Sequence, residues 1–200
     1  CGSAPPPLVD RIALLPVDNQ TGDATLDWVR DAVPAMISGQ LTGVGNLVPV
    51  RAASSVEATG LGAQHMVHGY VERRGATLHF SFSIEDAGTH RLRPVAADGD
   101  VVAAATRLSR EIDPGARPFS TSQVAAVEAW ARRDFARAVE LDPNFGSAWV
   151  AWAETLMSVP GQAVEIADRG LKQGGLQSPL DRAELGLLAA RLHGDSAAVI

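Results

Sequence analysis

The chain has 200 residues, 46% of them hydrophobic, and a formal net charge of −6, which is typical of one medium globular domain with a smaller second part. Its 17 lysines and arginines are scattered among 23 acidic residues, so no basic stripe of the kind that binds nucleic acid is present, and no apolar run reaches the roughly 18–20 residues of a membrane span. The single cysteine excludes an intrachain disulfide framework and a cysteine-rich zinc site.

Residues 1–9 are predicted to be a tether. Cys1-Gly-Ser3 resembles the mature start of a bacterial lipoprotein, in which a signal peptide is cut before a lipid-modified cysteine. Ala4-Pro-Pro-Pro7 predicts a stiff, extended spacer. The resemblance implies lipid attachment at Cys1 and a location in the bacterial cell envelope, facing the periplasm. The alternative is a sequence that happens to begin at a cysteine, because a removed signal peptide leaves no trace in it.

The next elements predict a βαβ unit. Arg11–Val17 is a short apolar run before a polar loop, typical of a buried strand. A helix follows within Trp28–Leu41, and Pro34 places its regular start near Asp31 if the proline lies in the first turn. Leu47–Arg51 predicts a second strand. Two strands separated by a helix favour a parallel pair with the helix packed on the sheet.

An antiparallel meander is expected next. A short helix at 54–61, capped by Ser54 or Ser55, leads into strands at 66–73, 77–85 and 90–95. In the second strand Leu78, Phe80, Phe82 and Ile84 are predicted to face inward, and His79, Ser81, Ser83 and Glu85 outward. Asp100 is expected to cap a helix from Val101 to Ile112. Residues 113–122, beginning Asp113-Pro-Gly-Ala-Arg-Pro118, predict the linker between domains.

Four short motifs occur in the order known from one domain family: Ile12-Ala-Leu-Leu-Pro16, Val48-Pro-Val-Arg51, Gly62-Ala-Gln-His-Met-Val-His-Gly69 and Ile84-Glu-Asp-Ala-Gly88. Residues 10–112 resemble the TolB amino-terminal-like family, with Val17 and Met66 in place of its usual aromatic residues. The resemblance implies an α/β domain that often precedes tetratricopeptide repeats.

Residues 123–200 predict helical repeats, because a shift of 36 residues keeps the size class at eight positions. The matched pairs are Ala131/Ala167, Phe135/Leu171, Ala138/Gly174, Pro143/Pro179, Trp149/Leu185, Trp152/Leu188, Ala153/Ala189 and Leu156/Leu192. One helix is expected over Gln123–Leu141, and a second with Asp142 as N-cap and Pro143 in its first turn. This pattern predicts a short helix-pair solenoid and resembles the tetratricopeptide repeat, whose usual unit is about 34 residues.

The repeats are expected to be incomplete at both ends. Counting back 36 residues from Trp149 gives Asp113, which cannot be a core position, so the first repeat keeps only its second helix. At the other end a final helix would begin at Ser196–Ile200. Residues 119–200 are therefore expected to pack on the α/β domain, on another copy of the chain or on further repeats, since so few helices bury little core.

A partner-binding groove is predicted on the helix face opposite the core positions. On one helix this stripe is Ser147, Val150, Glu154 and Met157, and the residues 36 later are Ala183, Gly186, Ala190 and His193. By resemblance to tetratricopeptide repeats, the stripe lines a concave groove that holds a peptide. An exposed Val and Met with one Glu suit a partly apolar partner segment. The alternatives are a solvent-facing stripe and one covered by further repeats.

No motif in the sequence predicts catalysis, a cofactor or a metal. His79, His90 and Glu85 could approach one another across a hairpin and bind zinc, but a polar, solvent-facing sheet surface is the favoured interpretation. The glycine-rich stretches at 42–46 and 60–62 lack the lysine of a phosphate loop. We therefore expect no enzyme activity, although distant residues could assemble a site.

Two classes of function remain open from the sequence. The first is a non-enzymatic scaffold of the bacterial envelope, anchored through Cys1, whose repeats recruit a protein or peptide partner. The alternative is a sensor or regulatory segment of a larger signalling protein (a kinase, cyclase or transcription regulator), with the α/β domain binding a ligand or self-associating.

Overall fold

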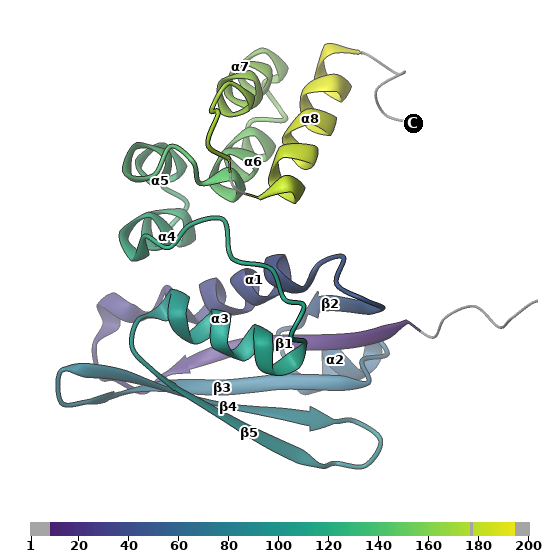
Figure 1. The fold of residues 1–200 in the computed structure, drawn as a ribbon, viewed down its shortest axis with the longest axis vertical. Coiled ribbons are helices and arrows are strands. Elements are labelled where there is room, and N and C mark those ends of the chain that lie inside the picture. Colours follow the sequence, from purple (N-terminus) through teal and green to yellow (C-terminus); the bar gives the residue numbers. More distant parts are fainter. Residues whose placement is uncertain (1–8, 177, 195–200) are drawn as a thin grey trace, which may run out of the picture. The chain divides into compact units, whose positions relative to one another are not determined.

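The computed structural model describes residues 9–176 and 178–194. The chain divides into two compact units, one ending at Phe119 and the other beginning at Ser120, here called the α/β unit and the helical unit (Figure 1). This division falls within the range 113–122 for which a linker was expected. The mixed α/β class is confirmed: one five-stranded mixed sheet is accompanied by eight α-helices within the described residues. None of those helices is long and apolar enough to cross a membrane.

The sheet of the α/β unit has the strand order β2-β1-β3-β4-β5. Its strands are β1 (Asp10–Asn19), β2 (Leu47–Arg51), β3 (His65–Arg74), β4 (Thr77–Asp86) and β5 (Leu92–Asp98). β1 pairs in parallel with both β2 and β3, whereas β4 pairs antiparallel with β3 and β5. The predicted βαβ start is therefore a parallel pair, as expected.

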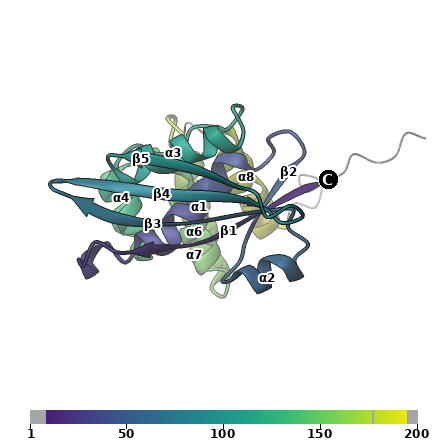
Figure 2. The same cartoon turned by 90° about the horizontal axis from the view of Figure 1, so that it is seen from below.

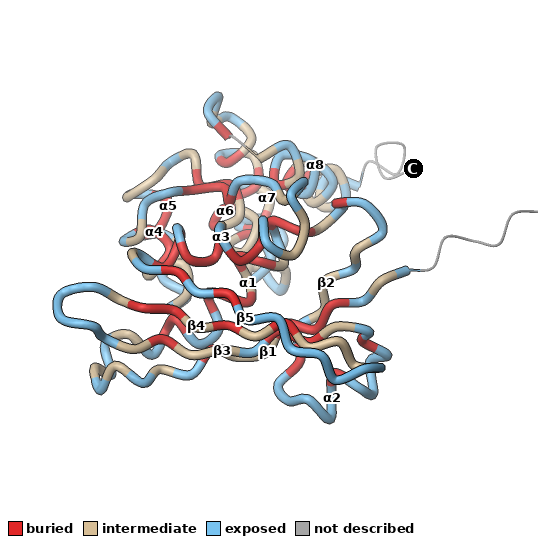
Figure 3. Tube along the Cα trace, turned by 60° about the horizontal axis from the view of Figure 1, so that its bottom comes forward, coloured by how far each residue is buried: buried red, intermediate tan, exposed pale blue. Residues whose placement is uncertain are grey.

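Helices α1 (Val29–Leu41) and α3 (Val101–Ile112) cover one face of the sheet (Figures 1 and 3). Leu14, Val67 and Ile84 stand side by side in the register of three strands and are buried. Between the two helices Gln40, which is 1% exposed, accepts from Ser109 Oγ (2.7 Å) and donates to Thr106 Oγ1 (2.9 Å). Both the nitrogen and the oxygen of this buried amide therefore have a hydrogen-bond partner, which offsets the free-energy cost of burying them.

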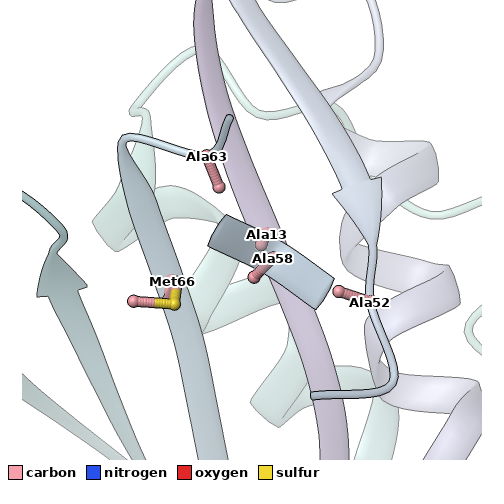
Figure 4. Close-up of a cluster of buried hydrophobic side chains, with 5 residues drawn as sticks. All are labelled: Ala13, Ala52, Ala58, Ala63 and Met66. Atoms are coloured by element: carbon pink, nitrogen blue, oxygen red, sulfur yellow. The ribbon is translucent and has the colours of Figure 1, made fainter. Parts of the chain in front are cut away.

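The short helix α2 (Ser55–Gly60) lies on the other face of the sheet (Figure 3). Ser54 caps it by accepting from Glu57 N, while the Glu57 carboxylate accepts from Ala53 N (2.7 Å). Beneath α2 is a cluster of small buried side chains, shown in Figure 4: Ala13, Ala52, Ala58, Ala63 and Met66. The small side chains allow a helix of six residues to sit close to the strands. Most of this face is left open (Figure 2).

Three boundaries in the α/β unit differ from the sequence prediction. α1 begins at Val29 instead of near Asp31, so Pro34 lies in its interior. Because proline has no N–H, it gives no helical hydrogen bond to the carbonyl of Arg30, four residues earlier. Arg30 is exposed, so water can bond to this carbonyl. The first hairpin turn is Gly75-Ala76, because Arg74 still pairs with Thr77.

The third strand of the meander was expected from His90 but begins at Leu92. Asp86 explains the delay, because its Oδ1 accepts from the N–H of Gly88 (3.1 Å) and Thr89 (2.7 Å) and holds the chain in a turn. His90 then has a φ of 54°, a left-handed conformation that no strand residue adopts.

The helical unit contains α4 (Val124–Ala131), α5 (Phe135–Leu141), α6 (Gly146–Thr155), α7 (Pro160–Leu171) and α8 (Pro179–His193). The single helix expected over Gln123–Leu141 is wrong, because Arg133 has a φ of 64° and Asp134 caps a new helix. The first helix pair therefore has both members. Asp142 is also not the N-cap of α6: its Oδ1 accepts from Asn144 N (3.0 Å) and its Oδ2 from Thr121 Oγ1 (2.6 Å).

Positions 36 residues apart are equivalent in α6 and α8, but positions 36 residues apart in α4, α5 and α7 are not. Trp149 and Ala153 of α6 are buried, and so are Leu185 and Ala189 of α8. By contrast, Ala131 and Phe135 lie in two different helices, although their counterparts Ala167 and Leu171 both lie in α7. The helix expected to begin at Ser196–Ile200 lies outside the described residues.

Alanine substitutions at two glycines of the helical unit are predicted to have opposite effects, because Gly146 lies at the contact between α6 and α8 and Gly161 lies in open space. A Cβ at Gly146 would stand 2.5 Å from the Cβ of Asp181, whereas one at Gly161 would meet nothing within 4 Å. Gly146→Ala is expected to lower the free energy of unfolding by about 1–3 kcal/mol through overpacking, although alanine itself favours helix. Gly161→Ala is the matched control and is expected to raise it by up to about 1 kcal/mol. Urea unfolding of both variants measures this, and a Gly146→Ala protein as stable as the parent would contradict it.

Candidate binding surfaces

The predicted groove stripe on α6 is partly covered by α8. Ser147 Oγ lies 3.1 and 3.2 Å from the two carboxylate oxygens of Asp181 on α8, to which it donates, and 2.8 Å from Ser120 Oγ. Asp181 is 5% exposed. Ser147 therefore takes part in the contact between α6 and α8, and its place in a partner-binding groove stays a prediction.

The other residues of the stripe have different surroundings. Val150 is half-buried and Glu154 exposed, and both continue the line of Ser147 along α6. Met157 is half-buried in the turn after α6 ends at Thr155. His193 lies at the end of α8, where its Nε2 is 3.3 Å from Asp168 Oδ2 of α7. The structure thus groups Ser147, Val150 and Glu154 on one side of α6 and places His193 toward α7.

Three carboxyl groups gather where α8 lies along this stripe. Burial raises the pKa of Asp181 above its usual value, against the lowering effect of the serine hydrogen bonds. Burial also raises the pKa of Glu184, and the negative charges of Asp181 and Glu154 raise it further. Glu154 on α6 and Glu184 on α8 are therefore close enough to repel each other, and the edge between the two helices is acidic.

The equivalent stripe on α8 is open at its start and meets α7 at its end. Its members, each 36 residues after the α6 stripe, are Ala183, which is exposed, Gly186 and Ala190, which are half-buried, and His193, which is exposed and lies beside Asp168 of α7. Leu187 lies between them and is 49% exposed. α8 thus has apolar side chains on two sides: the buried side, with Leu185 and Ala189, and this open side.

A second surface, which the sequence did not predict, is a cleft in the α/β unit. It has a volume of about 270 Å³ and is lined by Leu15, Pro16, Asp18, Arg30, Ala53, His68, Gly69 and Tyr70. These residues come from the carboxyl-terminal part of β1, the start of α1, the segment after β2 and the middle of β3. They share no local sequence pattern, so only the strand order brings them together.

The wall of the cleft is shaped by an irregularity in β1. Leu14 pairs with Val67 and Val17 with Gly69, so Leu15 and Pro16 together stand opposite His68. This is a β-bulge, which bends the strand and re-aims its side chains. Gly69 is required next to it, because a Cβ there would overlap the Ser81 carbonyl oxygen and the Phe82 ring.

The histidines do not converge on a common site. His79 was expected to be exposed but is 7% exposed, and its Nδ1 donates to Asp98 Oδ1 (2.6 Å) across the strands. This hydrogen bond is the main cause of the lowered pKa of Asp98. His90 Nδ1 instead bonds to Glu85 Oε1 (3.0 Å). In the part of the chain that the structure describes, no group of three or more His, Cys, Asp or Glu residues could hold a metal ion.

The raised pKa of Asp181 predicts a pH-dependent stability. The folded protein holds this proton more tightly than the unfolded chain does, so stability is lost as pH rises above the usual aspartate value. Asp181→Asn cannot ionise, and its amide oxygen can still accept from Ser147. Between about pH 4 and about pH 7, the parent protein is expected to lose free energy of unfolding relative to this variant, measured by urea unfolding at both pH values. Parallel pH profiles for the two proteins would contradict the assignment.

Comparisons with known proteins give fold similarities alone. No protein-family model matches the sequence, and no curated protein matches it. The dodecameric PelC of Paraburkholderia phytofirmans is 15% identical, with a TM-score of 0.37 over 58% of this chain and 96% of that chain; a variant of the same protein is 14% identical, with a TM-score of 0.36 over 51% and 82%. TolB of Acinetobacter baumannii is 12% identical, with a TM-score of 0.37 over 55% of this chain and 28% of that chain. The chain therefore has a weak structural similarity to PelC and TolB, and it spans less than a third of the TolB chain.

Proposed function

We propose that this chain is a non-enzymatic protein-interaction scaffold whose helical unit binds an apolar helix of a partner protein on the open side of α8. One observation carries the proposal. α8 packs along the stripe of α6 that begins at Ser147, whereas the stripe 36 residues later, on α8, is open at Ala183 and Gly186 and meets α7 at its far end, through His193. A surface that repeats the position of a helix-binding surface is suited to the same kind of occupant.

The residues of the open stripe define the chemistry of that occupant. Ser147 and Glu154 of α6 correspond to Ala183 and Ala190 of α8, so the polar groups of the first contact are replaced by methyl groups. Gly186 stands inside α8, where glycine costs about 0.5–1 kcal/mol relative to alanine, and a Cβ there would meet nothing within 4 Å. The small residues beside the exposed Leu187 leave room for a partner helix to approach α8 closely. The expected partner segment is a helix with an apolar face and no required acidic group.

We propose further that the two units are a TolB amino-terminal-like domain and tetratricopeptide-like repeats. Sequence motifs support the first assignment: Ile12–Pro16 lies in β1, Gly62–Gly69 leads into β3, and Ile84–Gly88 closes the β4 strand. The antiparallel order of β3, β4 and β5 agrees with a meander. The 36-residue spacing between the buried residues of α6 and those of α8 supports the second assignment.

A location in the bacterial envelope completes the proposal. It rests on Cys1 and the proline-rich residues after it, which resemble the start of a lipoprotein. Lipid on Cys1 would hold the folded units beside a membrane that faces the periplasm. The alternative, a regulatory segment of a larger signalling protein, is favoured by the cleft of the α/β unit, because such a cleft suits a ligand.

Leu187→Glu tests the partner surface. A photo-crosslinking amino acid at position 183, in the native host, is expected to join the chain to its partner, whereas the same group at position 159 is not. With the purified partner, Leu187→Glu is expected to weaken binding at least about tenfold, because a charge on the apolar face loses its water. Stability should change by less than about 0.5 kcal/mol.

The matched control is Val159→Glu, since Val159 is 46% exposed and lies before α7, away from the stripe. Equal loss of binding in both variants, or no loss in either, would contradict the α8 surface. A crosslink to a second copy of the chain would show that this surface mediates self-association and does not bind a different protein.

Cys1→Ser tests the anchor. If the gene encodes a signal peptide before Cys1, the parent protein is expected to partition with membranes and to gain the mass of a lipid. The Cys1→Ser protein should remain in the aqueous fraction, since removal of the acyl chains removes their burial free energy of about 0.8 kcal/mol per methylene. A Cys1→Ser protein that still sediments with membranes would contradict lipid attachment at this residue.

A further inference from the structure

We infer that the cleft of the α/β unit binds a small zwitterionic molecule of the amino-acid type, with its carboxylate on Arg30 and its ammonium group on Asp18. This goes beyond the proposed scaffold function and uses none of the residues of the α8 surface.

The first support is the position of the cleft in the topology. From β1 the chain passes through α1 on one face to β2, and from β2 it passes through α2 on the other face to β3. The two connections therefore diverge on opposite sides of β1. Open α/β sheets bind their ligands at the carboxyl ends of the strands where the order reverses in this way. The cleft residues Leu15, Pro16 and Asp18 lie in that part of β1.

The second support is the irregular pairing of β1 with β3 at the cleft. Leu15 and Pro16 share a single opposing residue, His68, and Pro16 has no N–H to give to the sheet. A bulge interrupts the hydrogen-bond ladder of its strand, and here it does so beside an opening of about 270 Å³. Such a volume is somewhat below the roughly 300–1,000 Å³ of sites for drug-sized ligands, so it suits a smaller molecule.

The third support is charge. Asp18 and Arg30 line the same cleft with opposite signs, yet they form no ion pair with each other or with any other described residue. Elsewhere in this unit charged neighbours do pair: Arg73 lies 3.2 Å from Asp23, and Arg74 lies 2.6 Å from Glu72. His68 and Tyr70 of the cleft likewise have no side-chain hydrogen bond within the described residues.

These charges define the class of ligand. A guanidinium binds a carboxylate through two parallel charge-assisted hydrogen bonds, and a carboxylate accepts from an ammonium group. A purely anionic ligand would be repelled by Asp18, and a purely cationic one by Arg30. A molecule that carries both charges satisfies both groups, while Leu15, Pro16 and the Tyr70 ring offer apolar contact to its remaining part.

The experiment uses the whole chain and the free standard amino acids, each tested singly at about 10 mM by thermal unfolding. A molecule that binds only the folded state raises the unfolding temperature in a saturable way. For each amino acid that does so, calorimetry compares it with two analogues: its amide, which lacks the carboxylate charge, and its deaminated acid, which lacks the ammonium group. The zwitterion is expected to bind at least about tenfold more tightly than either analogue.

Variants locate the site. Arg30→Gln and Asp18→Asn are each expected to weaken binding at least about tenfold, since each removes one charge-assisted hydrogen bond. Arg110→Gln on α3 is the matched control, because Arg110 is exposed and lies outside the cleft. Leu187→Glu should also bind the amino acid normally, which separates this inference from the scaffold function.

Three results would overturn the inference. The first is no shift of the unfolding temperature with any of the amino acids. The second is an analogue that binds as tightly as the zwitterion. The third is unchanged affinity in Arg30→Gln or Asp18→Asn.

Discussion

Parallel pairing of β1 with both of its neighbours is the constraint on which the α/β unit depends. Two parallel strands cannot be joined by a tight turn, so each pairing requires a crossover connection. With β1 between β2 and β3, the connections take opposite faces: α1 packs over Leu14, and α2 over Ala13. The small Ala13 and the large Leu14 of β1 suit these two coverings, because the buried cluster at the short helix consists of alanines and Met66.

The two edges of the sheet are protected in the same way. β2 and β5 are the edge strands, and each carries a proline near its middle, Pro49 and Pro94. Proline cannot donate a backbone hydrogen bond, so it disfavours the addition of another strand. Partner binding by strand addition is therefore disfavoured, which agrees with a partner surface on a helix.

In the helical unit, close approach depends on glycine at three contacts. Gly146 lies against Asp181, Gly170 lies against Trp149 and Leu185, and Gly175 lies against Asn144. Asp181 is buried at the first of these contacts, where Ser147 hydrogen-bonds its carboxylate. Such a pair orients α8 on α6 at some cost in desolvation. Aromatic contacts join α6 to α7: Trp149 and Trp152 of α6 stack with ring centroids 5.8 Å apart, and Arg169 of α7 lies over both rings.

Sequence periodicity predicted several of the residues that face a core, and local signals predicted where some of the elements begin. The alternation of Leu78, Phe80, Phe82 and Ile84 predicted one face of β4, and Phe80, Phe82 and Ile84 are buried as expected. Asp100 was identified correctly as a cap, and Ser54 was one of the two candidates for the other, because capping depends on residues within one turn.

Tertiary structure alone decided what covers each face. Periodicity could not indicate that Asp98 would hydrogen-bond His79, nor that α8 would lie along Ser147, since these partners are 19 and 34 residues away. The break at Arg133 was missed because a left-handed residue other than glycine leaves no compositional signal. The cleft joins Asp18, Arg30 and His68 from three separate elements. Strand order brought them together, and strand order depends on contacts between segments that no local pattern encodes.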